Sequence, residues 1–185
     1  MKKRAFIIHG FEGSPDESWF GWLKRKLEEN RFTVEVPAMP RPRKPNVYEW
    51  VSHIRKVVDV PDKQCYFIGH SLGCITILRY LESLEKTERV GGAVFVAGFA
   101  ENIGLKDIRG FFQKDIEWSE IRKHCKKFVA INSNNDEYVA EDSGKIFGEK
   151  LGAEVVVINN MGHFTIEDGI TSLHPVLDAV LRISD

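Results

Sequence analysis

The sequence predicts a single-domain α/β fold built on about six parallel strands. Short apolar runs alternate with longer amphipathic segments along the 185 residues, the order expected when helices connect parallel strands. The length fits one domain, since domains usually contain roughly 100–200 residues. We therefore expect one three-layer domain over residues 1–185, with helices on both faces of the sheet.

Six short runs of apolar or β-branched residues predict the strands. Their continuous apolar character indicates strands buried on both faces, rather than strands that alternate polar and apolar residues. The predicted strands are residues 5–8, 33–36, 65–68, 92–96, 128–131 and 155–158.

Apolar residues at helical spacing predict the helices between these strands. The predicted helices are residues 19–29, 47–58, 72–84 and 140–151, with a last one from about residue 175 to residue 183. Residues 37–45 contain four prolines and suit an extended surface connection, because proline disrupts helices and inner strands.

Composition excludes several classes of protein. The net charge of −1 argues against electrostatic binding to nucleic acid or an anionic membrane. The first apolar run, residues 5–8, is too short for a signal peptide, and no segment approaches the ~18 apolar residues of a membrane span. We therefore expect a cytoplasmic protein with no nucleic-acid partner and no membrane span.

Three cysteines without a C-x-x-C pairing predict core thiols rather than a metal site.

A Gly-x-Ser-x-Gly motif at residues 69–73 centres on Ser71. It lies between a predicted strand and a predicted helix, the context in which this motif presents a nucleophile. Glycines two residues to either side allow strand and helix to approach closely, and the helix N-terminus favours negative charge. A phosphate-binding turn or an N-cap serine would give the same pattern, and that alternative stays open here.

A serine nucleophile needs a base, and the base needs an acid to hold it. The order along the chain in this kind of fold is serine, acid, histidine. Asp136 follows the fifth predicted strand and His163 follows the sixth, so both reach the same sheet edge as Ser71. We predict a catalytic triad of Ser71, Asp136 and His163, with Glu137 as the alternative acid. The other histidines are weaker candidates for the base: His9, His53, His70, His124 and His174.

Two backbone N–H groups are expected to form an oxyanion hole. One belongs to Leu72, directly after the nucleophile, and the other to Phe11 in the loop after the first strand. Gly10 and Gly13 would let that loop fold toward the serine, although a plain flexible connection is the alternative. His9 and His70, at the ends of the first and third predicted strands, are expected to line the pocket.

Residues 99–125 are longer than a bare connection and rich in apolar side chains. Either they form the crossover that packs on the sheet, or they fold over the nucleophile as a small cap. In the second case Phe111, Phe112 or Trp118 would line the substrate pocket.

These motifs resemble the small serine hydrolases related to retinoblastoma-binding protein 9 and bacterial YdeN. The resemblance rests on His-Gly at 9–10, Gly-His-Ser-x-Gly at 69–73, Asn-Asp at 135–136 and Gly-His-Phe at 162–164, and it covers nearly the whole chain. It implies an α/β-hydrolase fold reduced at its N-terminus, with a triad that maps onto Ser71, Asp136 and His163. The retinoblastoma-pocket motif L-x-C-x-E is absent around Cys65 and Cys74, so that partner is not expected.

We therefore expect strands in the spatial order 2-1-3-4-5-6 and a serine hydrolase that acts on a small-molecule acyl substrate. An ester, thioester or amide would be cleaved through an acyl-enzyme intermediate, with no metal and no organic cofactor. Two alternatives stay open: a degenerate hydrolase that acts as a protein-binding module, and a flavodoxin-like nucleotide or flavin module, whose glycine-rich motifs are absent.

Overall fold

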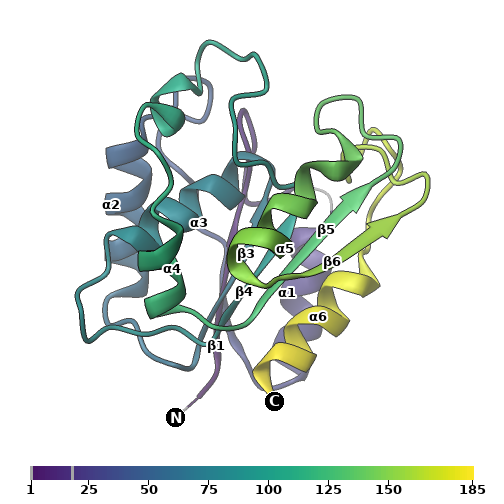
Figure 1. Cartoon of the computed structure of the whole chain (residues 1–185). Coiled ribbons are helices and arrows are strands. Elements are labelled where there is room, and N and C mark those ends of the chain that lie inside the picture. Colours follow the sequence, from purple (N-terminus) through teal and green to yellow (C-terminus); the bar gives the residue numbers. More distant parts are fainter. Residues whose placement is uncertain (1, 18) are drawn as a thin grey trace.

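The computed structural model describes residues 2–17 and 19–185. Over these residues the chain forms one six-stranded, all-parallel sheet in the order β2-β1-β3-β4-β5-β6 (Figure 1). The predicted fold class and strand order are therefore confirmed. The strands are β1 (Arg4–Ile8), β2 (Thr33–Glu35), β3 (Cys65–His70), β4 (Gly92–Val96), β5 (Phe128–Ser133) and β6 (Glu154–Ile158).

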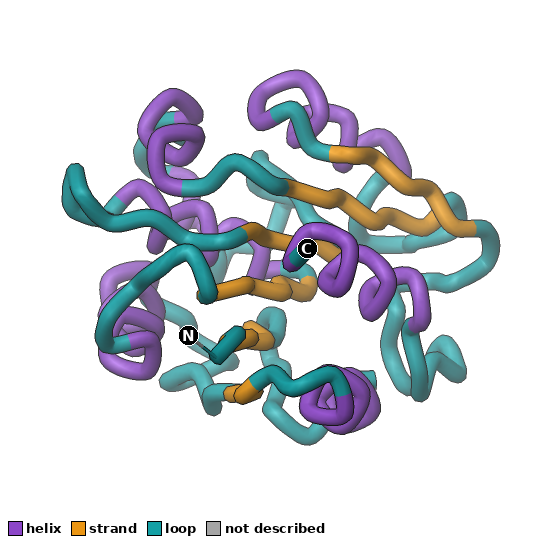
Figure 2. The backbone as a smooth tube through the Cα atoms, turned by 90° about the horizontal axis from the view of Figure 1, so that it is seen from below, coloured by secondary structure: helices purple, strands orange, loops and turns teal. Residues whose placement is uncertain are grey.

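Helices cover both faces of the sheet, because successive side chains of a strand point to opposite faces. Phe6 and Ile8 of β1 belong to one hydrophobic cluster, and Ala5 and Ile7 to the other. Helices α2 to α5 pack on the first face and α1 and α6 on the second, and a view from below shows the strands between these layers (Figure 2). The helices are α1 (Phe20–Glu29), α2 (Val47–Val58), α3 (Leu72–Glu82), α4 (Trp118–His124), α5 (Lys145–Leu151) and α6 (His174–Ser184).

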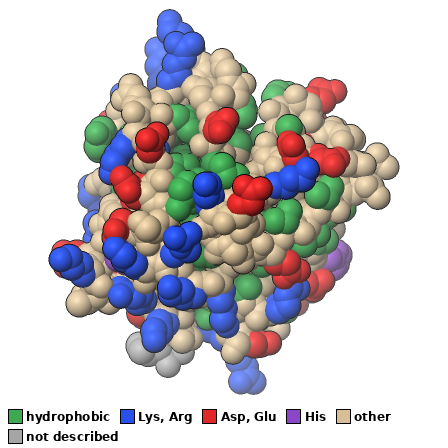
Figure 3. Space-filling view, viewed as in Figure 1, with side chains coloured by type: hydrophobic (Ala, Val, Ile, Leu, Met, Phe, Trp, Pro, Cys, Tyr) green, Lys and Arg blue, Asp and Glu red, His purple; other side chains and the backbone are tan. Residues whose placement is uncertain are grey.

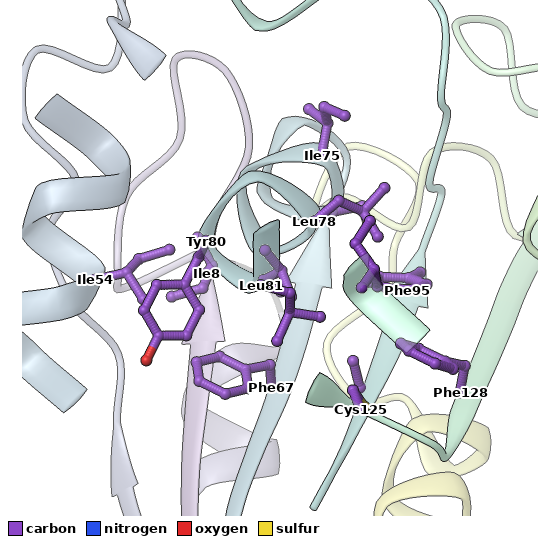
Figure 4. Close-up of a cluster of buried hydrophobic side chains, with 14 of the residues drawn as sticks. Ile8, Ile54, Phe67, Ile75, Leu78, Tyr80, Leu81, Phe95, Cys125 and Phe128 are labelled. Carbon is purple, nitrogen blue, oxygen red and sulfur yellow. The ribbon is translucent and has the colours of Figure 1, made fainter. Parts of the chain in front are cut away.

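Helix α3 lies at the centre of the larger cluster and is buried over most of its length. Leu78, Tyr80 and Leu81 point toward Phe67 and Phe95 of the sheet (Figure 4). Full burial of a side chain of this size contributes about 1.5–3 kcal/mol. The N-terminus of α3, where Ser71 lies, is therefore held on a rigid element.

The prediction of full burial is wrong for the two outer strands. β2 is buried only at its middle residue, and Val155 and Val157 of β6 are 37% and 45% exposed. Both strands lie at the edges of the sheet, where one side has no neighbouring strand and helix cover is incomplete. The predicted helix 140–151 is also divided, into a short 3₁₀ turn, η2 (Glu141–Gly144), and α5.

All three cysteines are free and buried, as predicted. Burial raises the pKa of Cys65 to about 11 and that of Cys125 to about 12, and it raises the pKa of Cys74 as well. The thiols are therefore protonated at neutral pH, the form in which a thiol is a weak nucleophile.

Residues 99–125 form a 3₁₀ turn, η1 (Arg109–Phe112), and α4, and they are tied to α3. The buried guanidinium of Arg79 donates to the carbonyl oxygens of Phe111, Lys114 and Asp115 and pairs with Glu82.

In the part of the chain that the structure describes, none of the helices has the length and apolar character of a membrane span.

Candidate active site

The three residues of the predicted triad lie at the carboxyl edge of the sheet, after β3, β5 and β6. His163 Nδ1 lies 2.8 Å from Asp136 Oδ2. Ser71 and His163 line one cavity of about 250 Å³. The fold thus brings together groups that are 92 positions apart in the sequence, from 71 to 163.

Ser71 occupies a strained turn between β3 and α3. Its φ of 53° and ψ of −120° lie in a region that residues other than glycine rarely adopt. A Cβ at Gly73 would lie 2.1 Å from the carbonyl oxygen of Ile8, and one at Gly69 would lie 2.8 Å from the backbone nitrogen of Cys74. The two motif glycines therefore permit the close approach of strands and helix that presents Ser71 at the helix N-terminus.

Asp136 is a fully engaged carboxylate whose side chain is only 1% exposed. Its Oδ1 accepts hydrogen bonds from the backbone N–H groups of Tyr138 (2.8 Å) and Val139 (3.0 Å), while Oδ2 faces His163. Glu137 is exposed, so Asp136 is the carboxylate that meets the histidine. Because Nδ1 of His163 faces Asp136, Nε2 is the ring nitrogen left to exchange a proton.

Side chains from three elements fix the backbone of His163. Its N–H donates to Asp168 Oδ2 (2.9 Å), and its carbonyl oxygen accepts from His70 Nε2 (2.8 Å). The preceding N–H, that of Gly162, donates to Asn135 Oδ1 (2.9 Å). The loops after β5 and β6 are thereby locked together.

Asp168 and Asn135 support this loop through these hydrogen bonds, a role that was not predicted for either residue from the sequence. The available signal was Thr-x-x-Asp at 165–168, a spacing at which side chains bind neighbouring backbone groups. Burial acts to raise the pKa of Asp168, but hydrogen bonds from Thr165 and from the N–H of His163 outweigh it, so the pKa is lowered. Asp168 is therefore ionised and a strong acceptor at neutral pH.

His70 connects the turn at Ser71 to the backbone of His163. Its ring packs edge-on against Trp19 and Phe20, with centroid distances of 6.1 and 6.0 Å. Burial, reinforced by the neighbouring His163, lowers the pKa of His70 to about 3. His70 is therefore neutral over the whole physiological range, and its Nε2–H donates to the His163 carbonyl.

This buried neutral histidine predicts an acid-sensitive fold. The folded pKa of His70, about 3, lies below the unfolded value of about 6.5, so the unfolded chain binds the extra proton between these pH values. The contribution of neutral His70 to the free energy of unfolding is therefore fully present above about pH 6.5. Below that pH, the free energy of unfolding falls by up to about 1.4 kcal/mol per pH unit. Urea unfolding at pH 7 and pH 5 should show a smaller loss for His70→Gln, which keeps an N–H donor, than for the wild type.

His53→Gln on α2 is the matched control, because His53 is only half-buried, and it should retain the wild-type loss. An equal loss in wild type and His70→Gln would show that His70 does not carry the effect.

The expectation that His9 lines the pocket is wrong. His9 is 1% exposed and lies beneath the loop, where its Nε2 accepts from the N–H of Met39 (3.0 Å) and its Nδ1 faces the carbonyl of Gly10 (2.9 Å). Burial lowers the pKa of His9. His9 therefore shapes the loop after β1 as a neutral ring.

The three aromatic residues expected in the pocket also lie elsewhere. Phe111 is buried against Trp50, with ring centroids 5.8 Å apart. The ring of Phe112 stacks on that of Phe99, with centroids 5.8 Å apart. The ring of Trp118 packs edge-on against Phe147, with centroids 6.4 Å apart. Because Arg79 holds this segment on α3, these side chains serve the core alternative for residues 99–125 and do not line the Ser71 cavity.

The cavity is lined by three loops and by the start of α1. A Cβ at Gly10 would lie 3.0 Å from Ser71 Cβ, so the loop after β1 passes directly beside Ser71, and the next residue, Phe11, also lines the cavity. Leu72 is the first residue of α3, where N–H groups have no acceptor within the helix. The remaining lining residues are Glu17, Trp19, Phe20, His70, Phe164, Thr165, Ile166 and Glu167.

The chain matches a known protein family along almost its whole length. The model of the family described as "Serine hydrolase" matches residues 5–182. The chain belongs to this family. It is 31% identical to the putative hydrolase YdeN of Bacillus subtilis over 97% of this chain and 95% of that protein. It is 25% identical to the serine hydrolase RBBP9 of Rattus norvegicus over 87% of each chain.

Solved structures agree with the fold. The crystal structure of the ydeN gene product from B. subtilis superimposes with a TM-score of 0.93 at 30% identity and covers 98% of each chain. Est1E from Butyrivibrio proteoclasticus gives a TM-score of 0.74 at 18% identity, over 98% of this chain and 88% of that one; this likeness concerns the fold alone. The predicted resemblance to small α/β-hydrolases related to YdeN is confirmed.

Proposed function

We propose that this serine hydrolase cleaves a small acyl ester, thioester or amide through an acyl-enzyme intermediate on Ser71. The observation that carries the proposal is the Asp136–His163 hydrogen bond of 2.8 Å, beside a cavity that Ser71 and His163 share. The strained backbone of Ser71 supports it, because strain of this kind persists where a nucleophile elbow needs it.

In the proposed mechanism Ser71 Oγ attacks the acyl carbonyl and its proton passes to His163 Nε2. Asp136 orients the imidazole and stabilises its charged form. The N–H groups of Leu72 and Phe11 would stabilise the developing oxyanion. His163 then returns the proton to the leaving group, and a water molecule, deprotonated by His163, hydrolyses the acyl-enzyme and regenerates Ser71.

The size of the cavity supports a small substrate. Its volume of about 250 Å³ lies below the roughly 300–1,000 Å³ typical of pockets for drug-sized ligands. Ile166, a lining residue that is 53% exposed, contributes apolar surface, which suits a short acyl chain.

A panel of p-nitrophenyl esters, thioesters and anilides of increasing acyl length tests the proposal, with wild type and Ser71→Ala side by side. We expect turnover to be fastest with short acyl chains and to require Ser71. A wild-type protein with no turnover of any member would favour the degenerate hydrolase that acts only by binding.

The charge of the cavity predicts discrimination against anionic substrates. Glu17 and Glu167 both line it; burial, followed by the nearby Glu167 charge, raises the pKa of Glu17 despite a hydrogen bond from the backbone of Ser14. A like charge about 4 Å away costs about 1 kcal/mol in a water-like medium, or roughly fivefold in rate. Glu17→Gln should therefore raise kcat/KM for an ester with a terminal carboxylate about fivefold relative to its neutral methyl ester.

Asp16→Asn is the matched control, because Asp16 is an exposed neighbour on the same loop. The wild-type discrimination should weaken as pH falls through the raised pKa of Glu17, where the carboxylate becomes neutral. Equal changes for both esters in Glu17→Gln would contradict the electrostatic explanation.

A further inference from the structure

A second cavity lies at the sheet edge opposite Ser71. Its volume is about 470 Å³. Its walls come from the segments that directly precede β3, β4 and β5, whereas the candidate active site is formed by segments that follow strands. In a parallel sheet these are opposite edges. The lining residues are Lys63, Tyr66, Arg89, Val90, Gly91, Lys123, His124, Lys126 and Lys127.

Five cationic side chains and no carboxylate line this cavity. Acidic neighbours in sequence are directed to other partners: Asp62 pairs with Arg4 (3.2 Å), and Glu88 pairs with Arg55 (3.6 Å). Lys123 alone among the five forms an ion pair in the described residues, with the half-buried Glu120. The lining of the cavity is therefore positively charged, although the chain has a net charge of −1, and two of the cations, Arg89 and Lys127, also donate to backbone carbonyl oxygens. Lys and Arg side chains gather on the lower left of the molecule in Figure 3.

The backbone of this basic pocket is a fixed frame. The N–H of Val90 donates to the carbonyl of His124 (2.9 Å), and the N–H of Gly91 donates to that of Cys65 (2.8 Å). A Cβ at Gly91 would lie 2.6 Å from the ring of Tyr66, so the glycine lets this loop press against the buried tyrosine. The cations are thus presented around a preformed hollow rather than along a flexible tail.

The shape and chemistry of the pocket select its ligand. Several cations around one hollow favour a compact anion with several charges, since charge-assisted hydrogen bonds to phosphate oxygens are stronger than neutral ones. The ring of Tyr66 and the side chain of Val90 are both 5% exposed, so the pocket offers little aromatic surface for stacking a base and little apolar surface for insertion into a bilayer. A small phosphorylated molecule fits better than a nucleic acid or a membrane.

We propose that this basic pocket binds a small, multiply phosphorylated anion at a site separate from the Ser71 cavity. Binding there would stabilise the folded chain, because a ligand that binds only the folded state raises its stability. Substrate would not compete with it, since the two cavities share no lining residue.

Inorganic pyrophosphate is the test ligand, titrated at low ionic strength by calorimetry and by thermal shift. We expect saturable binding and a raised melting temperature for wild type and for Ser71→Ala. The double variant Lys63→Gln/Lys126→Gln removes two exposed cations of the pocket and should weaken binding by at least about tenfold, the size expected for loss of two charge-assisted contacts. The control Lys44→Gln/Lys106→Gln removes two exposed charges elsewhere and should bind as the wild type does.

Three outcomes would overturn the proposal. Equal weakening in both double variants would mean a diffuse attraction of ions rather than a site. Binding to vesicles that contain phosphorylated inositol lipids, without binding of free pyrophosphate, would assign the pocket to a membrane. Tighter binding of a single-stranded oligonucleotide than of pyrophosphate, lost in Lys63→Gln/Lys126→Gln, would assign it to nucleic acid.

Discussion

Alanine at Ser71 or at His163 should each lower turnover of a short acyl ester by about 10⁴- to 10⁶-fold, and the double variant should lose little more. The reason is that nucleophile and base act as a unit: without His163 the Ser71 hydroxyl stays protonated, and without Ser71 the histidine has no proton to accept. The measurement is kcat for a p-nitrophenyl ester in both single variants and the double variant.

Ser52→Ala, an exposed serine on α2, is the matched control and should retain wild-type turnover. Both alanine variants should stay folded, because each replaces a side chain at the cavity with a smaller one. Losses that multiply in the double variant would mean that the two residues act independently, and the assignment of both roles would fail.

Asp136→Asn should lower turnover by about 10⁴-fold with little effect on KM. The amide can still accept hydrogen bonds from the N–H groups of Tyr138 and Val139, which Asp136 accepts now, so the loop should keep its shape. What it loses is the negative charge that stabilises a protonated His163 2.8 Å away. The measurement is kcat and KM for the same ester.

Glu137→Gln is the matched control for Asp136→Asn, because Glu137 is the next residue in the chain and its side chain is exposed. It should retain turnover within about twofold, as expected for a surface substitution. If Glu137→Gln proved the more damaging of the two, the acid would be misassigned.

Most of the fold could be predicted because buried parallel strands have a strong local signal. The runs at β1, β3, β4 and β5 are continuous and apolar, and each is buried over nearly its whole length. The edge strands β2 and β6 carry similar residues, yet their exposure depends on their place in the sheet, which a run of valines does not encode. Sheet position is a tertiary property, so this part of the prediction failed.

The approach of Ser71, Asp136 and His163 could be predicted because topology alone determines it. Each residue lies in the segment that follows a strand, and parallel strands end at one edge. The pocket lining could not be predicted in this way. Phe111 and Trp118 have the apolar character of pocket residues, but the buried guanidinium of Arg79 holds their segment against α3, a contact that spans more than thirty positions.

The hydrogen bonds that support the candidate site could not be predicted from the sequence for a related reason. His70 and Asp168 act through hydrogen bonds to the backbone of His163, and backbone acceptors and donors are the same at every position of a sequence. The basic pocket likewise combines three segments whose charges are diluted by acidic neighbours along the chain. Net charge, which argued against binding to nucleic acid or an anionic membrane, averages over both edges of the sheet.

The most direct test of the central claim is to map the site that a fluorophosphonate probe labels. A serine activated by a base beside an oxyanion hole attacks such phosphorus centres. Peptide mass spectrometry of the labelled protein should find one modified residue, Ser71, with no label in Ser71→Ala and much slower labelling in His163→Ala. Label on another residue, or label that persists in Ser71→Ala, would contradict the assignment of Ser71 as the nucleophile.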